Sequence, residues 1–112
     1  MTTKFLAPVT VAVGLLLSAP ASARADLGAP AAKRAAIAIL IGDPYGRTAA
    51  QVSRNIVGQQ RLTDDVCHTG KRVWKFHVVL RPSTTLPDGA DGYLVLDAAT
   101  GKFVCAGLPL LD

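Results

Sequence analysis

The chain has 112 residues, a formal net charge of +4 at pH 7 and hydrophobic side chains at half of its positions. Its basic residues form no stripe with interleaved aromatic side chains, which argues against binding to nucleic acid. The length fits one small domain, and no internal repeat suggests a second one.

Residues 1–25 have the pattern of a secretory signal sequence. A basic start containing Lys4 precedes an apolar run at residues 5–17, and the tripeptide ARA at residues 23–25 offers the small side chains that signal peptidase needs. The alternative is a membrane anchor, but a spanning helix needs about 20 apolar residues and this run is shorter. We therefore expect an exported protein, periplasmic or secreted, with a mature domain at residues 26–112 and no stable membrane insertion.

A first helix is expected at residues 30–41. Pro30 suits a first turn because its missing amide hydrogen would have no helical partner, and Gly42 favours an end. A membrane-surface helix is the weaker alternative for so short a run. The face expected to pack on the core carries apolar residues at helical spacing: Ile37, Leu40 and Ile41.

A turn and a second helix should follow. Residues 43–46, DPYG, match a type I turn, with Asp first, Pro second and Gly fourth. Thr48 and Gln51 have the spacing of a capping box, and apolar residues then recur at helical spacing until Gly58. Three arginines stand seven residues apart, which we interpret as one solvated helix face and not as a basic patch: Arg47, Arg54 and Arg61.

Two strands are predicted next, and the sequence pattern indicates the second more clearly than the first. Residues 61–68 could form a first strand that turns at residues 69–71 into the second. Residues 73–80, VWKFHVVL, alternate between two faces. The set expected to face the helices is Trp74, Phe76, Val78 and Leu80.

Residues 81–90, RPSTTLPDGA, cannot continue a central strand because two prolines interrupt them. We expect an exposed loop. The simpler interpretation is a surface loop that only connects two strands and has no role in binding. This loop is nevertheless the best candidate for recognition of a partner. The residues of that candidate recognition loop are Arg81, Thr84, Thr85, Leu86 and Asp88.

The strongest local pattern is a β-hairpin with strands at residues 92–96 and 102–106. Asp97 can accept hydrogen bonds from the amides after it, and Gly101 suits a left-handed turn position. The leucines of residues 108–112 should pack back on the domain or leave a small exposed apolar tip.

The strand at residues 73–80 and the hairpin sequence GYLVLDAATGK resemble the PepSY domain, in which a helical start packs on a small antiparallel sheet. The resemblance extends from the first helix to Ala106. It implies an α+β fold, with one or two N-terminal helices packed on a three- to four-stranded antiparallel sheet. Similar domains occur in propeptides of secreted metalloproteases and as exported proteins thought to modulate peptidases. The resemblance implies no catalytic residue and no cofactor.

Cys67 and Cys105 are the only cysteines, and an exported chain meets an oxidising compartment, so we expect one intramolecular disulfide. A free thiol pair and bonds between chains are the alternatives. A disulfide would consume the one thiol in the only local group of potential metal ligands, so we expect no metal site. That group is Asp64, Asp65, Cys67 and His68. His77 lies on a predicted strand, where packing or surface roles are usual.

These patterns favour a small exported binding module without enzyme activity, whose partner is a protein or peptide, such as a peptidase or another envelope protein. One alternative is a thiol-redox or metal-binding protein that uses Cys67, His68 and Cys105, although Cys-X-X-Cys spacing is absent. Another is a cystatin-like protease inhibitor, although IVGQQ at residues 56–60 does not match the Gln-Val-X-Val-Gly pattern of that family. A nucleophile elbow, as in many hydrolases, is also absent from the sequence.

Overall fold

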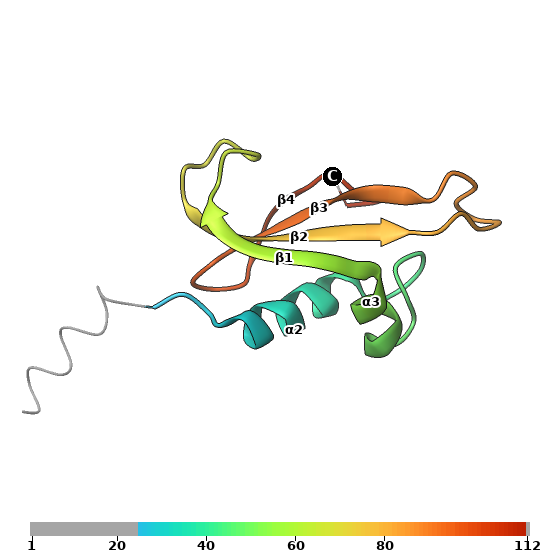
Figure 1. The fold of residues 1–112 in the computed structure, drawn as a ribbon, viewed down its shortest axis with the longest axis horizontal. Helices are drawn as coiled ribbons and strands as arrows, with labels where there is room; N and C mark the ends of the chain where they lie inside the picture. Colours follow the sequence, from blue (N-terminus) through green and yellow to red (C-terminus); the bar gives the residue numbers. More distant parts are fainter. Residues whose placement is uncertain (1–24, 112) are drawn as a thin grey trace, which may run out of the picture.

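The computed structural model describes residues 25–111, so the predicted signal sequence lies outside the described residues except for Ala25. The elements are α2 (Ala29–Leu40), α3 (Ala49–Asn55), β1 (Ile56–Thr63), β2 (Arg72–Leu80), β3 (Ala90–Asp97) and β4 (Phe103–Ala106). The strands form one antiparallel sheet in the order β1-β2-β3-β4, and both helices lie against the same face (Figure 1). The predicted α+β class is confirmed. No helix in this part of the chain has the length and hydropathy needed to span a membrane.

The face of α2 that packs on the sheet agrees with the predicted one at Leu40 and in part at Ile37, but not at Ile41. Its buried residues are Ala32, Ala36 and Leu40, each four positions from the next. Ile37 is half-buried, whereas Ile41 is 48% exposed. The reason is that the helix ends at Leu40, and the extended backbone of Ile41 takes this residue off the helical face.

The turn between α2 and α3 begins one residue earlier than the DPYG pattern predicts. The Tyr45 amide donates to the Gly42 carbonyl at 2.8 Å, and the Asp43–Pro44 peptide bond inside this turn is cis. α3 then starts with the predicted capping box. The Gln51 amide donates to the Thr48 hydroxyl at 3.2 Å, and the Gln51 side-chain oxygen accepts from the Thr48 amide at 3.3 Å.

α3 is shorter than predicted because Ile56 already belongs to β1. Ile56 is paired with Val78 of β2, so cross-strand pairing overrides the helical spacing that continues to Gly58. The first strand therefore begins before the predicted residues 61–68. The three arginines lie on different elements and share no helix face, which corrects their interpretation: Arg47 precedes α3, Arg54 is in α3 and Arg61 is in β1.

The core lies between the sheet and the helices. The predicted alternation of β2 is confirmed, since four of its residues belong to the buried core: Trp74, Phe76, Val78 and Leu80. Leu94 and Leu96 of β3 lie directly opposite Phe76 and Trp74 and complete this layer. Phe76 is fully buried, as expected for a central position in the sheet.

The other face of the sheet is partly covered by the connection between β1 and β2, residues 64–71 (Figure 1). Cys67 in this connection is disulfide-bonded to Cys105 of β4, as predicted, with the two Cα atoms 6.1 Å apart. Val95, directly opposite Cys105, and Val73 are each 1% exposed although neither belongs to the core under the helices. The disulfide thus holds this loop over two apolar side chains that the helices do not reach.

The hairpin of β3 and β4 forms as predicted. The Asp97 carboxylate accepts hydrogen bonds from the amides of Ala99 (2.9 Å) and Thr100 (3.1 Å), and Gly101 has a φ of 77°. Burial opposes ionisation of Asp97, but these hydrogen bonds outweigh it and lower the pKa of the carboxyl.

The segment before α2 is also fixed to the sheet. The Leu27 amide donates to the Ala98 carbonyl at 2.7 Å, and the Trp74 indole donates to the Leu27 carbonyl at 3.0 Å. Asp26 lies 3.6 Å from the guanidinium of Arg72. These contacts fix the segment before α2 to β2 and to the turn between β3 and β4.

Candidate functional site

Two adjoining hollows lie where β2 ends and β3 begins, and Pro44 and Leu86 line both of them. The first has a volume of about 260 Å³ and is completed by Asn55, Leu80, Arg81, Pro82 and Ser83. The second has a volume of about 250 Å³ and is completed by Asp43, Thr85, Pro109 and Leu110. We call this set of lining residues the Leu86 surface.

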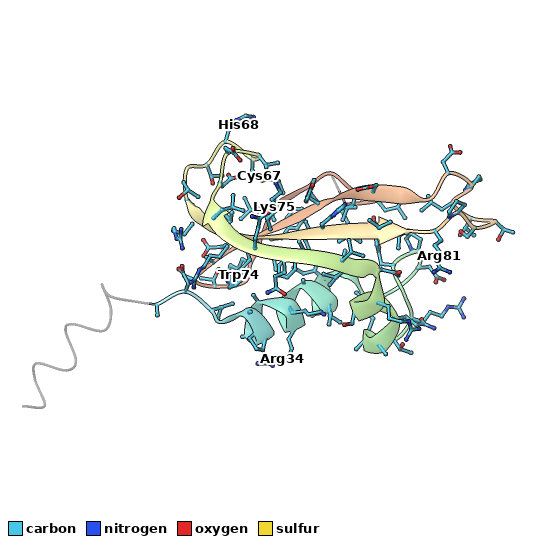
Figure 2. All side chains as sticks on the ribbon, in the orientation of Figure 1. Arg34, Cys67, His68, Trp74, Lys75 and Arg81 are labelled. Atoms are coloured by element: carbon cyan, nitrogen blue, oxygen red, sulfur yellow. A yellow bond between two sulfur atoms is a disulfide. The ribbon has the colours of Figure 1, made fainter. Side chains whose placement is uncertain are left out.

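The predicted recognition loop contributes to this surface only in part. Arg81, Thr85 and Leu86 line the hollows, whereas Thr84 and Asp88 are exposed outside them. Figure 2 shows Arg81 beside the turn that joins α2 to α3. In the structure the loop therefore lies against the α2–α3 turn, a contact that the sequence did not predict.

Hydrogen bonds within the loop give it a defined shape. The Ser83 amide donates to the Leu86 carbonyl at 2.9 Å, and the Gly89 amide donates to the same oxygen at 2.9 Å. Gly89 has a φ of 68°, and a Cβ atom there would lie 2.4 Å from the Leu80 carbonyl, so only glycine fits. Leu86 is half-buried against the core, and the side chains around it remain at the surface.

The last described residues form the other wall of the second hollow. Leu108 is 2% exposed and anchors this segment in the core, and the Tyr45 hydroxyl donates to the Pro109 carbonyl. The Leu111 amide donates to the Leu108 carbonyl at 3.2 Å, which closes a turn. Within this turn Leu110 has a φ of 70° and is 82% exposed. Both predicted outcomes for these leucines occur together: Leu108 and Leu111 pack back, and Leu110 forms an exposed apolar tip.

The charged groups of the Leu86 surface differ in their partners. Asp43 pairs with Arg47 at 3.3 Å, so its charge is partly compensated. Among residues 25–111, no carboxylate lies within salt-bridge distance of Arg81. Arg81 is therefore the cation of this surface that has no compensating charge on the described chain.

The second group that the sequence singled out, Asp64, Asp65, Cys67 and His68, does not form a ligand site. The buried Asp64 carboxylate instead accepts hydrogen bonds from the amides of Val66, Cys67 and Thr69 at 2.8 to 2.9 Å. It also accepts from the Thr69 hydroxyl at 2.6 Å. Cys67 is in the disulfide, and His68 is exposed with a φ of 63°. Within the described ranges, no three histidine, cysteine or acidic side chains are placed to hold a metal ion together.

These hydrogen bonds lower the pKa of Asp64 from 3.8 to about 2, with the Thr69 hydroxyl as the main cause and the Cys67 amide next. Because the folded-state pKa is depressed, the stabilisation by this carboxylate is complete above about pH 4 and is lost as the pH falls through about 2. We expect the melting temperature of the wild-type protein to fall more steeply between those pH values than that of Asp64→Asn. Thermal melts across this range, with Asp65→Asn as the control, check this. An Asp64→Asn variant as acid-sensitive as the wild type would contradict it.

A second exposed cluster lies on the face of the sheet away from the helices. The rings of His77 and Tyr93, directly opposite each other in β2 and β3, stack with centroids 5.0 Å apart. The Lys75 ammonium lies 4.3 Å from the Tyr93 centroid, and His77 Nε2 lies 2.6 Å from an Asp91 oxygen. The polar groups of this cluster thus already engage one another. For this reason we place the candidate site at the Leu86 surface, where Arg81 has no such partner.

Sequence reasoning missed Pro44, Asn55, Pro109 and Leu110 as parts of the site. Pro44 was predicted only as part of a turn, and Leu110 only as part of a terminal segment that packs back or leaves an exposed apolar tip. Single prolines far apart in the chain, Pro44, Pro82 and Pro109, line the site, but nothing local in the sequence indicates that they meet.

Comparisons of this chain with protein-family models, with curated proteins and with solved structures found no match.

Proposed function

We propose that this chain is a small exported, PepSY-like binding module that has no enzyme activity of its own. Its partner is a protein or peptide, such as a peptidase or another envelope protein, and the Leu86 surface makes the contact. The observation that carries the proposal is Leu110, an apolar side chain that is 82% exposed at the edge of a hollow lined by Pro44, Leu86 and Pro109. An exposed apolar side chain beside an apolar hollow is a feature of surfaces that bind partners.

Export is supported by the apolar segment at residues 5–17 together with the disulfide, since disulfides persist in oxidising compartments. The PepSY-like assignment is supported by the hairpin sequence GYLVLDAATGK and by two helices that precede a four-stranded antiparallel sheet.

The test is an affinity experiment. The oxidised, processed protein is immobilised on a resin and incubated with periplasmic extract of the source cells, and the retained proteins are identified. Leu110→Ala and Val57→Ala are compared with the wild type, because both remove exposed aliphatic side chains, 82% and 57% exposed, from different surfaces. We expect a partner that the wild type and Val57→Ala retain and that Leu110→Ala loses. A partner lost only by Val57→Ala would place recognition at the β1 edge and contradict the assignment to the Leu86 surface. A partner that all three immobilised proteins retain equally, or the absence of any retained partner, would also contradict it.

A further inference from the structure

We infer that the Leu86 surface recognises an extended peptide segment in which a carboxylate and an apolar side chain stand two residues apart. This inference rests on the proposed function and specifies the chemistry of the partner.

The arrangement of the hollows suits a peptide that presents two side chains. They have volumes of about 260 and 250 Å³ and are neighbours, because Pro44 and Leu86 line both. In an extended strand, side chains at alternate positions point to the same side and stand about 7 Å apart. A peptide lying across both hollows would therefore present alternate side chains to them.

The first hollow has the chemistry of a carboxylate site. Arg81 brings a guanidinium without a carboxylate partner in the described chain. Ser83 lines the same hollow, but its hydroxyl already accepts a hydrogen bond from the Leu86 amide at 3.2 Å. The side-chain amide of Asn55 is already used, since it donates to the Tyr45 carbonyl at 2.9 Å. A guanidinium binds a carboxylate through two parallel charge-assisted hydrogen bonds, so an acidic side chain is the complementary group.

The second hollow has the chemistry of an apolar site. Pro44, Leu86, Pro109 and Leu110 supply aliphatic surface, and the Asp43 carboxylate is paired with Arg47. Leu110 also adopts a φ of 70°, a backbone region that costs energy for a leucine side chain. A strained, exposed leucine at the rim of an apolar hollow is consistent with a side chain kept for contact with a partner.

The probe is a phage-displayed library of random heptapeptides, selected against the immobilised oxidised protein. Arg81→Glu and Arg34→Glu are selected in parallel; both reverse one exposed charge, and Figure 2 shows Arg34 on α2, away from Arg81. We expect the wild type and Arg34→Glu to enrich peptides with an acidic residue two positions from an aliphatic or aromatic residue. Arg81→Glu should lose the acidic preference and bind a synthetic copy of the selected peptide about tenfold to a hundredfold more weakly.

A second variant, Leu110→Gly, separates binding from folding. Glycine adopts a φ of 70° without strain, so the melting temperature should stay unchanged or rise, while the affinity for the selected peptide should fall. A fall in both quantities would overturn the assignment of Leu110 as a contact residue.

The remaining outcomes separate this inference from the proposed function. Selected peptides without an acidic preference that still need Leu110 would overturn the carboxylate inference and leave the binding function in place. Self-association of the chain that Arg81→Glu abolishes, with no peptide enriched, would assign the surface to a second copy and overturn the inference. Enrichment that neither Arg81 nor Leu110 affects would contradict both proposals.

Discussion

Replacing both Cys67 and Cys105 by serine is expected to lower the free energy of unfolding by about 4 kcal/mol, the chain-entropy value for a loop of this length. The two cysteines are 38 positions apart, and their bond holds the 64–71 loop over Val73 and Val95. A domain of this size has a total stability of only about 5 to 10 kcal/mol, so this loss is a large fraction. Urea unfolding of the oxidised wild type and the double variant measures it.

Reduction of the wild type under native conditions is the matched control and should reach the same unfolding midpoint. The Asp64 hydrogen bonds hold the same loop independently of the disulfide. A loss below about 1 kcal/mol would therefore mean that these bonds keep the loop in place and that the entropic account of the disulfide is wrong. Loop 81–90 lies at the other end of β2, so the folded double variant should still bind any partner that the wild type retains in the affinity experiment.

Phe76→Ala is expected to destabilise the protein by about 3 to 5 kcal/mol. Phe76 is fully buried in the core under the helices, opposite Leu94, and its truncation leaves a cavity that the paired strands cannot collapse to fill. Phe103 is 45% exposed, so Phe103→Ala removes the same atoms from a position that keeps much of its contact with water.

Urea unfolding of these two alanine variants compares buried and exposed positions for an identical chemical change. We expect Phe103→Ala to cost about 1 kcal/mol or less. Similar losses for the two variants would contradict the placement of the core between the sheet and the helices.

Features set by neighbouring residues were predictable from the sequence. The alternation at residues 73–80, the Thr48 and Gln51 capping box, and the turn from Asp97 to Gly101 depend on side chains only a few positions apart. Each has a local physical cause that does not require the rest of the fold: strand periodicity, amide capping or a left-handed glycine.

Apart from the disulfide, which follows from the presence of only two cysteines, features set by distant residues were not predictable. Helical spacing continues past Ile56, and only the pairing of this residue with Val78 makes it part of a strand. Loop 81–90 was recognisable from its prolines, which placed Arg81, Thr85 and Leu86 in the candidate site. The contribution of Pro44 and Leu110 depends on tertiary packing that brings the α2–α3 turn and the last residues against this loop.

The most direct test of the assigned surface is hydrogen–deuterium exchange of the oxidised protein, alone and bound to the partner that the affinity experiment retains. Contact at the Leu86 surface predicts slower amide exchange on binding in residues 81–90 and 108–111, with β1 unchanged. Slower exchange in β1, or on β2 and β3 around His77 and Tyr93, with residues 81–90 unaffected, would contradict the account.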